Sequence, residues 1–362
     1  MTETDESGID LSSRGSFKIA DAETQDAAKL AMVLDLMARR PAVQTLRAWA
    51  LEQLAPVAGE TAVDVGSGTG EDVVALAKLV GPQGHAIGIE PSPGLRAEAH
   101  HRASKATAKT AAANGKADGE AEAAAGAEVD GEAEAAAGAE VEGEAGAAAK
   151  TTWAPAGAGA EGEVGVAARV EAVAEAGADG VAGRPGVGDG GGVEFVDGDV
   201  GALPLAGESV DVVRCERVLQ HVADAGGAVR EMARVLRPGG RIVLIDTDWA
   251  TAIVHPADPV VLQKMIDHFL ADSANPYSGR RLRGQLAAAG LEITGETAAT
   301  WIEAQERARQ GFASMMHLTA LHAGVITEAE AEAFAKDLAD AADRGAFHLS
   351  LTMYAVSARK PA

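Results

Sequence analysis

The sequence predicts an α/β protein with a doubly wound, mostly parallel sheet of seven strands and an antiparallel last strand. Three observations support this fold class. Short apolar segments alternate with helical segments along much of the 362-residue chain, which is the pattern of a parallel sheet. A glycine-rich turn joins the first predicted strand to a helix. Acidic residues follow several strands, and ligands of such sheets bind at the carboxyl ends of the strands.

Two helices are expected before the sheet, within residues 22–54. Leu30, Val33 and Leu34 recur at helical spacing, and Pro41 begins a second helical segment. We consider two roles for this pair: packing beside the sheet, or forming a lid over the ligand.

The first strand, Ala62 to Val65, leads into a turn with glycine at alternate positions, Gly66, Gly68 and Gly70. Glycine lets the backbone turn tightly and brings its amides close to a ligand. The turn therefore predicts a ligand site, and the next residues indicate which ligand.

Glu71 and Asp72 open the following helix. A dinucleotide site has its third glycine where Glu71 stands and puts a diphosphate on the helix N-terminus. Two carboxylates there would repel a diphosphate. S-adenosylmethionine carries a sulfonium and an ammonium and no phosphate, so it suits this turn better. Asp64, at the end of the strand, is expected near the ammonium.

The second strand, His85 to Ile89, ends in Glu90. An acid about twenty residues after the glycine turn, at the end of a strand, is placed to accept hydrogen bonds from both ribose hydroxyls. The alternative is that Glu90 is an acid in a surface loop.

Later strands also end in polar residues. Asp199 follows the third strand and is expected to accept from the adenine amino group, while the amide of Val200 reaches a ring nitrogen. The remaining strands are expected at Ser209 to Cys215, Arg241 to Ile245, Leu291 to Ile302 and Phe347 to Val356. The residues expected on one rim of the sheet are Gly66, Glu90, Asp199, Glu216 and Asp246.

Residues 104–191 interrupt this pattern. They contain two identical copies of D-G-E-A-E-A-A-A-G-A-E-V and no Leu, Ile, Met or Phe, and they carry a net charge of −10. Such a segment buries too little apolar surface to offset its chain entropy. We expect a disordered low-complexity insertion at 104–191, a disordered tail at 1–16, and one domain made of 17–103 and 192–362.

Composition limits the partners and the location. The net charge of −23 argues against nucleic acid and anionic membranes. No apolar run is long enough to span a membrane, and the acidic N-terminus does not look like a signal peptide. Cys215 is the one cysteine, which fits a reducing cytoplasm. We therefore expect a cytoplasmic protein whose partner is a small molecule, with no metal site, and the oligomeric state stays open.

Several motifs resemble those of class I S-adenosylmethionine-dependent methyltransferases, in particular the ubiquinone/menaquinone-type (methyltransferase type 11) branch and actinobacterial natural-product O-methyltransferases. They are V-D-V-G-S-G-T-G, G-I-E-P-S, G-D-V-G-A-L-P, S-V-D-V-V-R-C-E-R-V-L-Q-H-V and V-L-R-P-G-G-R-I-V-L-I-D. The resemblance covers about residues 63–90 and 193–246. It implies a Rossmann-like methyltransferase sheet and S-adenosylmethionine as cofactor.

The resemblance also implies roles for individual residues. The methionine part of the cofactor would lie against the glycine turn, Glu90 would bind the ribose, and Asp199 with Val200 would hold the adenine. Glu216 and Arg217 would line the inner side of the cofactor. The residues implied for the methionine part are Asp64, Gly66, Ser67, Gly68 and Gly70.

The expected activity is transfer of a methyl group to an O, N or C atom of a small acceptor, with the natural-product and quinone-like classes as candidates. His221, after the fourth strand, is the expected general base, and Asp246 is expected to orient it; alternatively His221 only shapes the pocket. Two other functions compete. One is a catalytically silent S-adenosylmethionine-binding regulatory module. The other is a nicotinamide-dependent oxidoreductase, which Glu71 disfavours.

Overall fold

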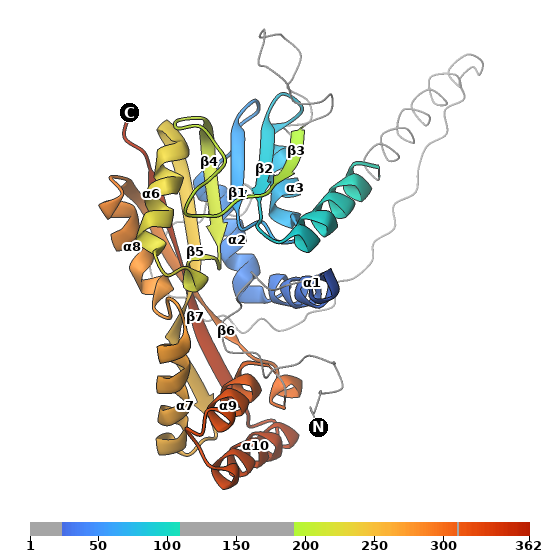
Figure 1. Ribbon diagram of the computed structural model, residues 1–362, viewed down its shortest axis with the longest axis vertical. Coiled ribbons are helices and arrows are strands. Elements are labelled where there is room, and N and C mark those ends of the chain that lie inside the picture. The colour runs from blue at the N-terminus through green and yellow to red at the C-terminus, as the bar shows by residue number, and fades with distance from the viewer. Residues whose placement is uncertain (1–23, 109–191, 310) are drawn as a thin grey trace, which may run out of the picture. The chain divides into compact units, whose positions relative to one another are not determined.

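The computed structural model describes residues 24–108, 192–309 and 311–362. Within these residues seven strands form one sheet in the order β3-β2-β1-β4-β5-β7-β6 (Figure 1). The strands are β1 (Thr61–Val65), β2 (His85–Ile89), β3 (Gly192–Val196), β4 (Val210–Glu216), β5 (Leu236–His255), β6 (Glu292–Ile302) and β7 (His348–Arg359).

The direction of the strands confirms the predicted fold class. β3, β2, β1, β4 and β5 pair in parallel. β7 is antiparallel to both β5 and β6, between which it lies. The chain leaves β1 toward β2 and returns to its other side at β4, so the strand order reverses there. Such a reversal opens a crevice at the carboxyl ends of the strands.

Helices cover both faces of the sheet. On one face α2 and α3 pack with β1, β2 and β3 residues, and on the other α6 and α8 cover β1, β4 and β5. Alternate residues of β1 serve the two cores: Val63 and Val65 face α6, while Ala62 faces α2. The helices are α1 (Thr24–Ala38), α2 (Pro41–Leu54), α3 (Glu71–Val80), α6 (Ala225–Val235), α7 (Pro259–Asp272), α8 (Ser278–Ala288), α9 (Phe312–His322) and α10 (Glu328–Asp343), with short turns η2 (Leu219–His221) and η3 (Gln305–Arg307).

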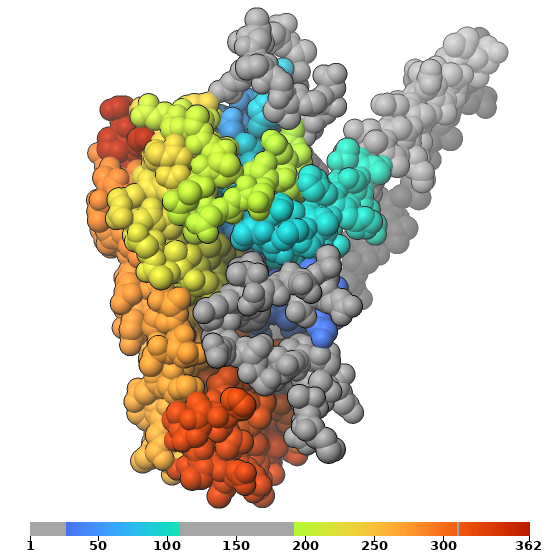
Figure 2. Space-filling model, in the orientation of Figure 1, coloured from blue at the N-terminus to red at the C-terminus, as the bar shows by residue number. Residues whose placement is uncertain are grey.

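Strand β5 is much longer than the predicted segment Arg241 to Ile245. It runs on to His255 because residues 247–248 and 253–255 pair with β7, from Met353 back to His348, on the two sides of a register shift. A third core lies at this extension and is formed mainly by α7, α9, α10 and the ends of β6 and β7. Figure 2 shows α9 and α10 gathered in red at one end of the face in view. Helix α9 begins at Phe312, after Gly311.

The predicted tail, residues 1–16, and most of the predicted insertion, residues 104–191, lie outside the described residues. Residues 93–108 are helical, and Ala99 and Ala103 join the core under α3. Ser104–Ala176 form a separate unit, of which 104–108 are described. No helix among the described residues is long and apolar enough to cross a membrane.

Candidate cofactor and acceptor site

The glycine turn after β1 lies at the carboxyl rim of the sheet. Gly66, Gly68 and Gly70 have φ values of 74°, 54° and 79°, a region that side chains disfavour. A Cβ on Gly66 would stand 2.2 Å from Val218, which follows β4, and one on Gly70 would stand 2.5 Å from Phe195 of β3. The backbone therefore approaches its neighbours too closely for any other residue.

Glu90 lies against this turn. Its carboxylate accepts from the amide of Gly68 at 3.0 Å and from the amide of Ser92 at 2.9 Å. The side chain is 4% exposed. Burial raises the pKa of Glu90, and the two amide hydrogen bonds oppose that shift. The acid predicted for the ribose is thus joined to the glycine turn by a hydrogen bond.

The turn also leaves a polar group unsatisfied. Ser67 Oγ is buried and has no hydrogen-bond partner among the described residues, which is uncommon in folded proteins. The glycine backbone around this hydroxyl is closely packed. The turn can therefore still form a hydrogen bond with a ligand through Ser67 Oγ. These features fit a ligand with donors and acceptors, as S-adenosylmethionine has.

The predicted adenine residues follow β3. Asp199 is exposed, and its carboxylate accepts from the amide of Gly201 at 2.7 Å. Val200 is half-buried and packs against the core on the α6 face.

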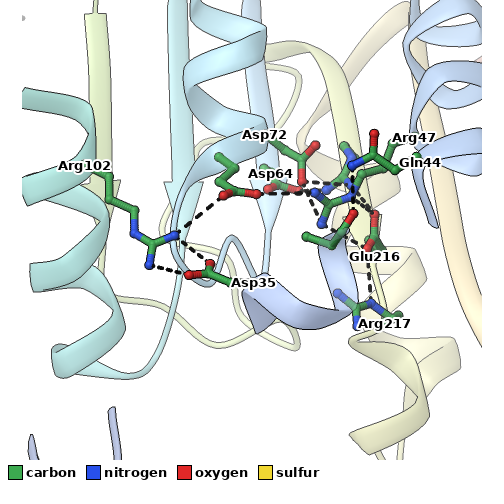
Figure 3. Close-up of polar contacts among 11 residues, drawn as sticks. Asp35, Gln44, Arg47, Asp64, Asp72, Arg102, Glu216 and Arg217 are labelled. Carbon is green, nitrogen blue, oxygen red and sulfur yellow. Dashed lines mark hydrogen bonds and ion pairs between the residues drawn. The ribbon is translucent and has the colours of Figure 1, made fainter. Parts of the chain in front are cut away.

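Figure 3 shows a charge network behind the turn that includes Asp64, Asp72 and Glu216. Arg214 of β4 forms ion pairs with all three and is central to the network. It donates to Asp64 of β1 at 2.9 Å, forms an ion pair with Asp72 of α3 at 3.0 Å, and hydrogen-bonds Glu216. Burial raises the pKa of Asp64 to about 7, with Arg214 opposing this shift. Sequence reasoning placed Asp64 beside a ligand ammonium; in the structure its neighbour is a guanidinium.

Glu216 has two further partners. Arg47 of α2 donates to it twice, at 2.9 and 3.1 Å, and Arg217 donates at 3.1 Å. Although Glu216 is buried, the arginines lower its pKa to about 2, so it is ionised. Arg217 has a φ of 57°, a strained conformation for arginine. Glu216 and Arg217, the residues predicted to line the inner side of the cofactor, therefore pair with each other at the end of β4.

A second branch of the network reaches α1. Arg102 forms two hydrogen bonds with Asp35 of α1, at 2.7 and 3.0 Å (Figure 3). It also forms an ion pair with Glu71 at 3.6 Å. Leu34 of α1 lies 3.1 Å from where a Cβ on Gly68 would stand. The first helix therefore covers the glycine turn, whereas α2 packs on the sheet. The predicted packing role applies to α2, and the role of a lid over the ligand stays a prediction for α1.

His221 and Asp246 lie near the end of β4 but are not hydrogen-bonded to each other. Asp246 is fully buried and accepts from the amides of Gln220 and Thr247 and from Ser278 Oγ, at 2.8–2.9 Å. Its carboxylate thus orders the loop that carries His221. Crowding by neighbouring atoms, with the charge of Arg217, lowers the pKa of His221 to about 4. The side chain also reaches solvent, and its lowered pKa makes the ring neutral at pH 7.

Sequence reasoning missed Arg214 and Arg47. An arginine inside the apolar strand V-D-V-V-R-C is a buried charge that needs partners. The sequence therefore indicated that Arg214 pairs with acidic residues. Nothing in the sequence indicated the role of Arg47, since its partner Glu216 lies 169 residues away.

Two family profiles match the chain. The "Methyltransferase domain" profile matches residues 153–244, and the "Protein-L-isoaspartate(D-aspartate) O-methyltransferase" profile matches residues 27–142. The first contains β3, β4 and most of the part of β5 that pairs with β4. The second contains the glycine turn and β2.

Curated relatives agree with the profiles. An uncharacterized protein in a transposon of Streptomyces fradiae is 25% identical over 90% of this chain and 70% of its own length. An uncharacterized methyltransferase of Schizosaccharomyces pombe is 31% identical over 34% of this chain and 46% of its own. The UbiE C-methyltransferase of Hahella chejuensis is 39% identical over 19% of this chain and 25% of its own length. The chain thus spans less than half of the last two relatives.

Among solved structures, the YcgJ protein of Bacillus subtilis is 15% identical, with a TM-score of 0.46 over 88% of this chain and 99% of its own. A putative methyltransferase of Bacillus halodurans is 13% identical, with a TM-score of 0.46 over 88% and 100%. Together, the two profiles, the curated methyltransferase relatives and the sheet order support assignment to the class I S-adenosylmethionine-dependent methyltransferases, with S-adenosylmethionine as the cofactor.

Proposed function

We propose that this protein transfers a methyl group from S-adenosylmethionine to an O, N or C atom of a small-molecule acceptor. The observation that carries the proposal is the hydrogen bond between Glu90 and the amide of Gly68. It joins the acid after β2 to the glycine turn after β1, at the crevice where the strand order reverses.

The cofactor supplies an activated methyl group on a sulfonium. Glu90 would accept from the ribose hydroxyls, and Asp199 with the Val200 amide would hold the adenine. The turn Gly66 to Gly70, with Ser67, would lie against the methionine part.

The charge network would bind the ends of the methionine. Asp64 and Glu216 offer carboxylates to the ammonium, and Arg47 offers donors to the carboxylate. Arg47 is suited to this because its side chain is 20% exposed, against 3% for Arg214. Binding would then exchange some of the present ion pairs for pairs with the ligand.

His221 would accept the proton of a hydroxyl or amine acceptor. Its neutral ring has that capacity at pH 7, and general-base catalysis is worth roughly 10²- to 10⁴-fold. Asp246 would act by holding the loop of His221. A carbon acceptor, as the name of the UbiE relative indicates for that protein, needs no such base.

Two measurements test the proposal. Calorimetry with S-adenosylmethionine, S-adenosylhomocysteine and NAD should show binding of the first two alone. Incubation with methyl-labelled S-adenosylmethionine and a host extract should then label a small molecule. Binding without any labelled product would favour the silent regulatory module, and binding of NAD alone would contradict the cofactor assignment.

With an acceptor in hand, His221→Asn should lower kcat by roughly 10²- to 10⁴-fold and leave cofactor affinity unchanged. His255→Asn, at an exposed histidine at the end of β5, is the control and should change neither. An unchanged kcat in His221→Asn would leave that residue a shaping role.

A further inference from the structure

A compact group of cationic and aromatic side chains lies where α2 begins and β6 ends. Arg40, 9% exposed, stacks on Trp301 with its guanidinium carbon 3.4 Å from the ring centroid. Glu303, 5% exposed, accepts from Arg40 Nη2 at 3.1 Å. Its other oxygen lies 3.4 Å from Arg307 Nε.

Three donors of this group are buried without a hydrogen-bond partner in the described part of the chain. They are Arg40 Nε, Trp301 Nε1 and Arg307 Nε; the last is near Glu303 but lacks hydrogen-bond geometry. Buried polar groups are nearly always paired, and an unpaired one carries its full desolvation cost. All three atoms are N–H donors, so the missing partner is an acceptor. An oxygen-bearing group has that chemistry.

The charges indicate an anion. Two arginines face one glutamate, which leaves one positive charge in a chain whose net charge is −23. Burial lowers the pKa of Arg40; Glu303 opposes that shift, and the positive charges of Arg307 and Arg217 add to it. A single negative charge placed among these arginines would relieve the excess. Arginine is also the side chain best suited to a carboxylate.

The surroundings indicate an apolar body. Trp301 belongs to the third core, with Trp249, Phe269 and Phe312. The ring centroids of these last three lie 5.1–5.2 Å apart. Trp301 pairs with Leu351 of β7, and the next residue of β7, Thr352, pairs with Asp248 of β5, two residues beyond Asp246. The group therefore lies past the carboxyl ends of the parallel strands, on the side where an acceptor would approach.

We propose that Arg40, Trp301 and Arg307 bind a carboxylate of the methyl acceptor, and that the acceptor is an aromatic or otherwise apolar monoanion. The inference rests on the proposed methyltransferase function for the identity of the ligand. The binding site itself does not depend on it.

The test uses the full-length protein saturated with S-adenosylhomocysteine and three probes of similar size, followed by ligand-observed NMR titration. Benzoate should bind at least tenfold more tightly than neutral benzamide. Arg40→Gln should reduce that preference to less than twofold, whereas Arg39→Gln, at the exposed neighbouring arginine, should keep it. Trp301→Phe retains a ring but loses the donor, and should weaken benzoate several-fold.

Equal affinity for benzoate and benzamide, or no benzoate binding, would overturn the proposal, because the donors would then be satisfied by water. Full preference in Arg40→Gln would overturn it too. Tighter binding of phenyl phosphate than of benzoate would contradict the assignment to a carboxylate. If Arg40→Gln does not fold, the proposal is tested by the benzoate and benzamide affinities of the wild type and by the benzoate affinity of Trp301→Phe. Benzoate preference without S-adenosylmethionine binding would refute the methyltransferase function and not the site.

Discussion

Asp64 and Arg214 stand opposite each other on the neighbouring parallel strands β1 and β4, and Arg214 Nη1 donates to Asp64 Oδ1 at 2.9 Å. They are 1% and 3% exposed. The same guanidinium contacts Asp72 and Glu216. One buried cation therefore holds three carboxylates from three elements in place behind the glycine turn.

Replacing that cation should be costly. Arg214→Gln leaves buried carboxylates without their main partner, and we expect the free energy of unfolding to fall by about 3–5 kcal/mol. Urea denaturation measures it. Arg309→Gln is the control: its ion pair with Asp343 is exposed on both sides, so its loss should cost less than about 1 kcal/mol. Similar small losses in both variants would mean that water, rather than Arg214, compensates the buried acids.

Glu90→Ala should weaken S-adenosylmethionine binding by about 1–3 kcal/mol, because two ribose hydroxyls would lose a charged acceptor. Calorimetric titration gives the difference directly. Glu194→Gln, at an exposed acid of β3, should bind as the wild type does. If Glu90→Ala kept full affinity, Glu90 would be a structural partner of Gly68 and no more.

Gly68→Val should abolish cofactor binding while circular dichroism still shows the fold, since a side chain there would block the ligand and crowd Leu34. Gly59→Val separates this effect from backbone strain. Gly59 also has a positive φ, 85°, but nothing lies within 4 Å of its Cβ position. It should lower stability and leave affinity unchanged. Retained affinity in Gly68→Val would show that the ligand does not lie over this turn.

Much of the fold was predictable because local patterns determine it. Strand β2 has the predicted bounds, His85 to Ile89, since five residues between turn signals allow few alternatives. The extension of β5 to His255 was not predictable, because it depends on pairing with β7 about a hundred residues later. Tertiary pairing overrides local propensity in such segments.

The site divides in the same way. Gly66, Gly68 and Glu90 follow from spacing along the chain, and the structure brings them together. Two partners from distant helices were not predictable: Arg47 of α2, which pairs with Glu216, and Ser278 of α8, which donates to Asp246. A charged residue at a strand end shows where a site lies but does not show which other side chain it contacts.

Asp246 makes stability depend on pH. Burial raises its pKa from 3.8 to about 7, against hydrogen bonds from Thr247, Ser278 and Gln220. An acid whose pKa is higher in the folded state binds a proton more readily when folded. The free energy of unfolding therefore falls as pH rises from about 4 to about 7, and the loss is complete above that range.

This one group contributes a slope of at most about 1.4 kcal/mol per pH unit. Asp246→Asn removes its proton, so urea denaturation at pH 5, 6, 7 and 8 should give a flatter dependence than the wild type. Asp64, whose pKa is also about 7, still titrates in the variant, so some slope should remain. Asp267→Asn, at an exposed position of α7, should keep the wild-type slope. The same slope in Asp246→Asn as in the wild type would mean that Asp246 is ionised throughout, held by its three donors despite its burial.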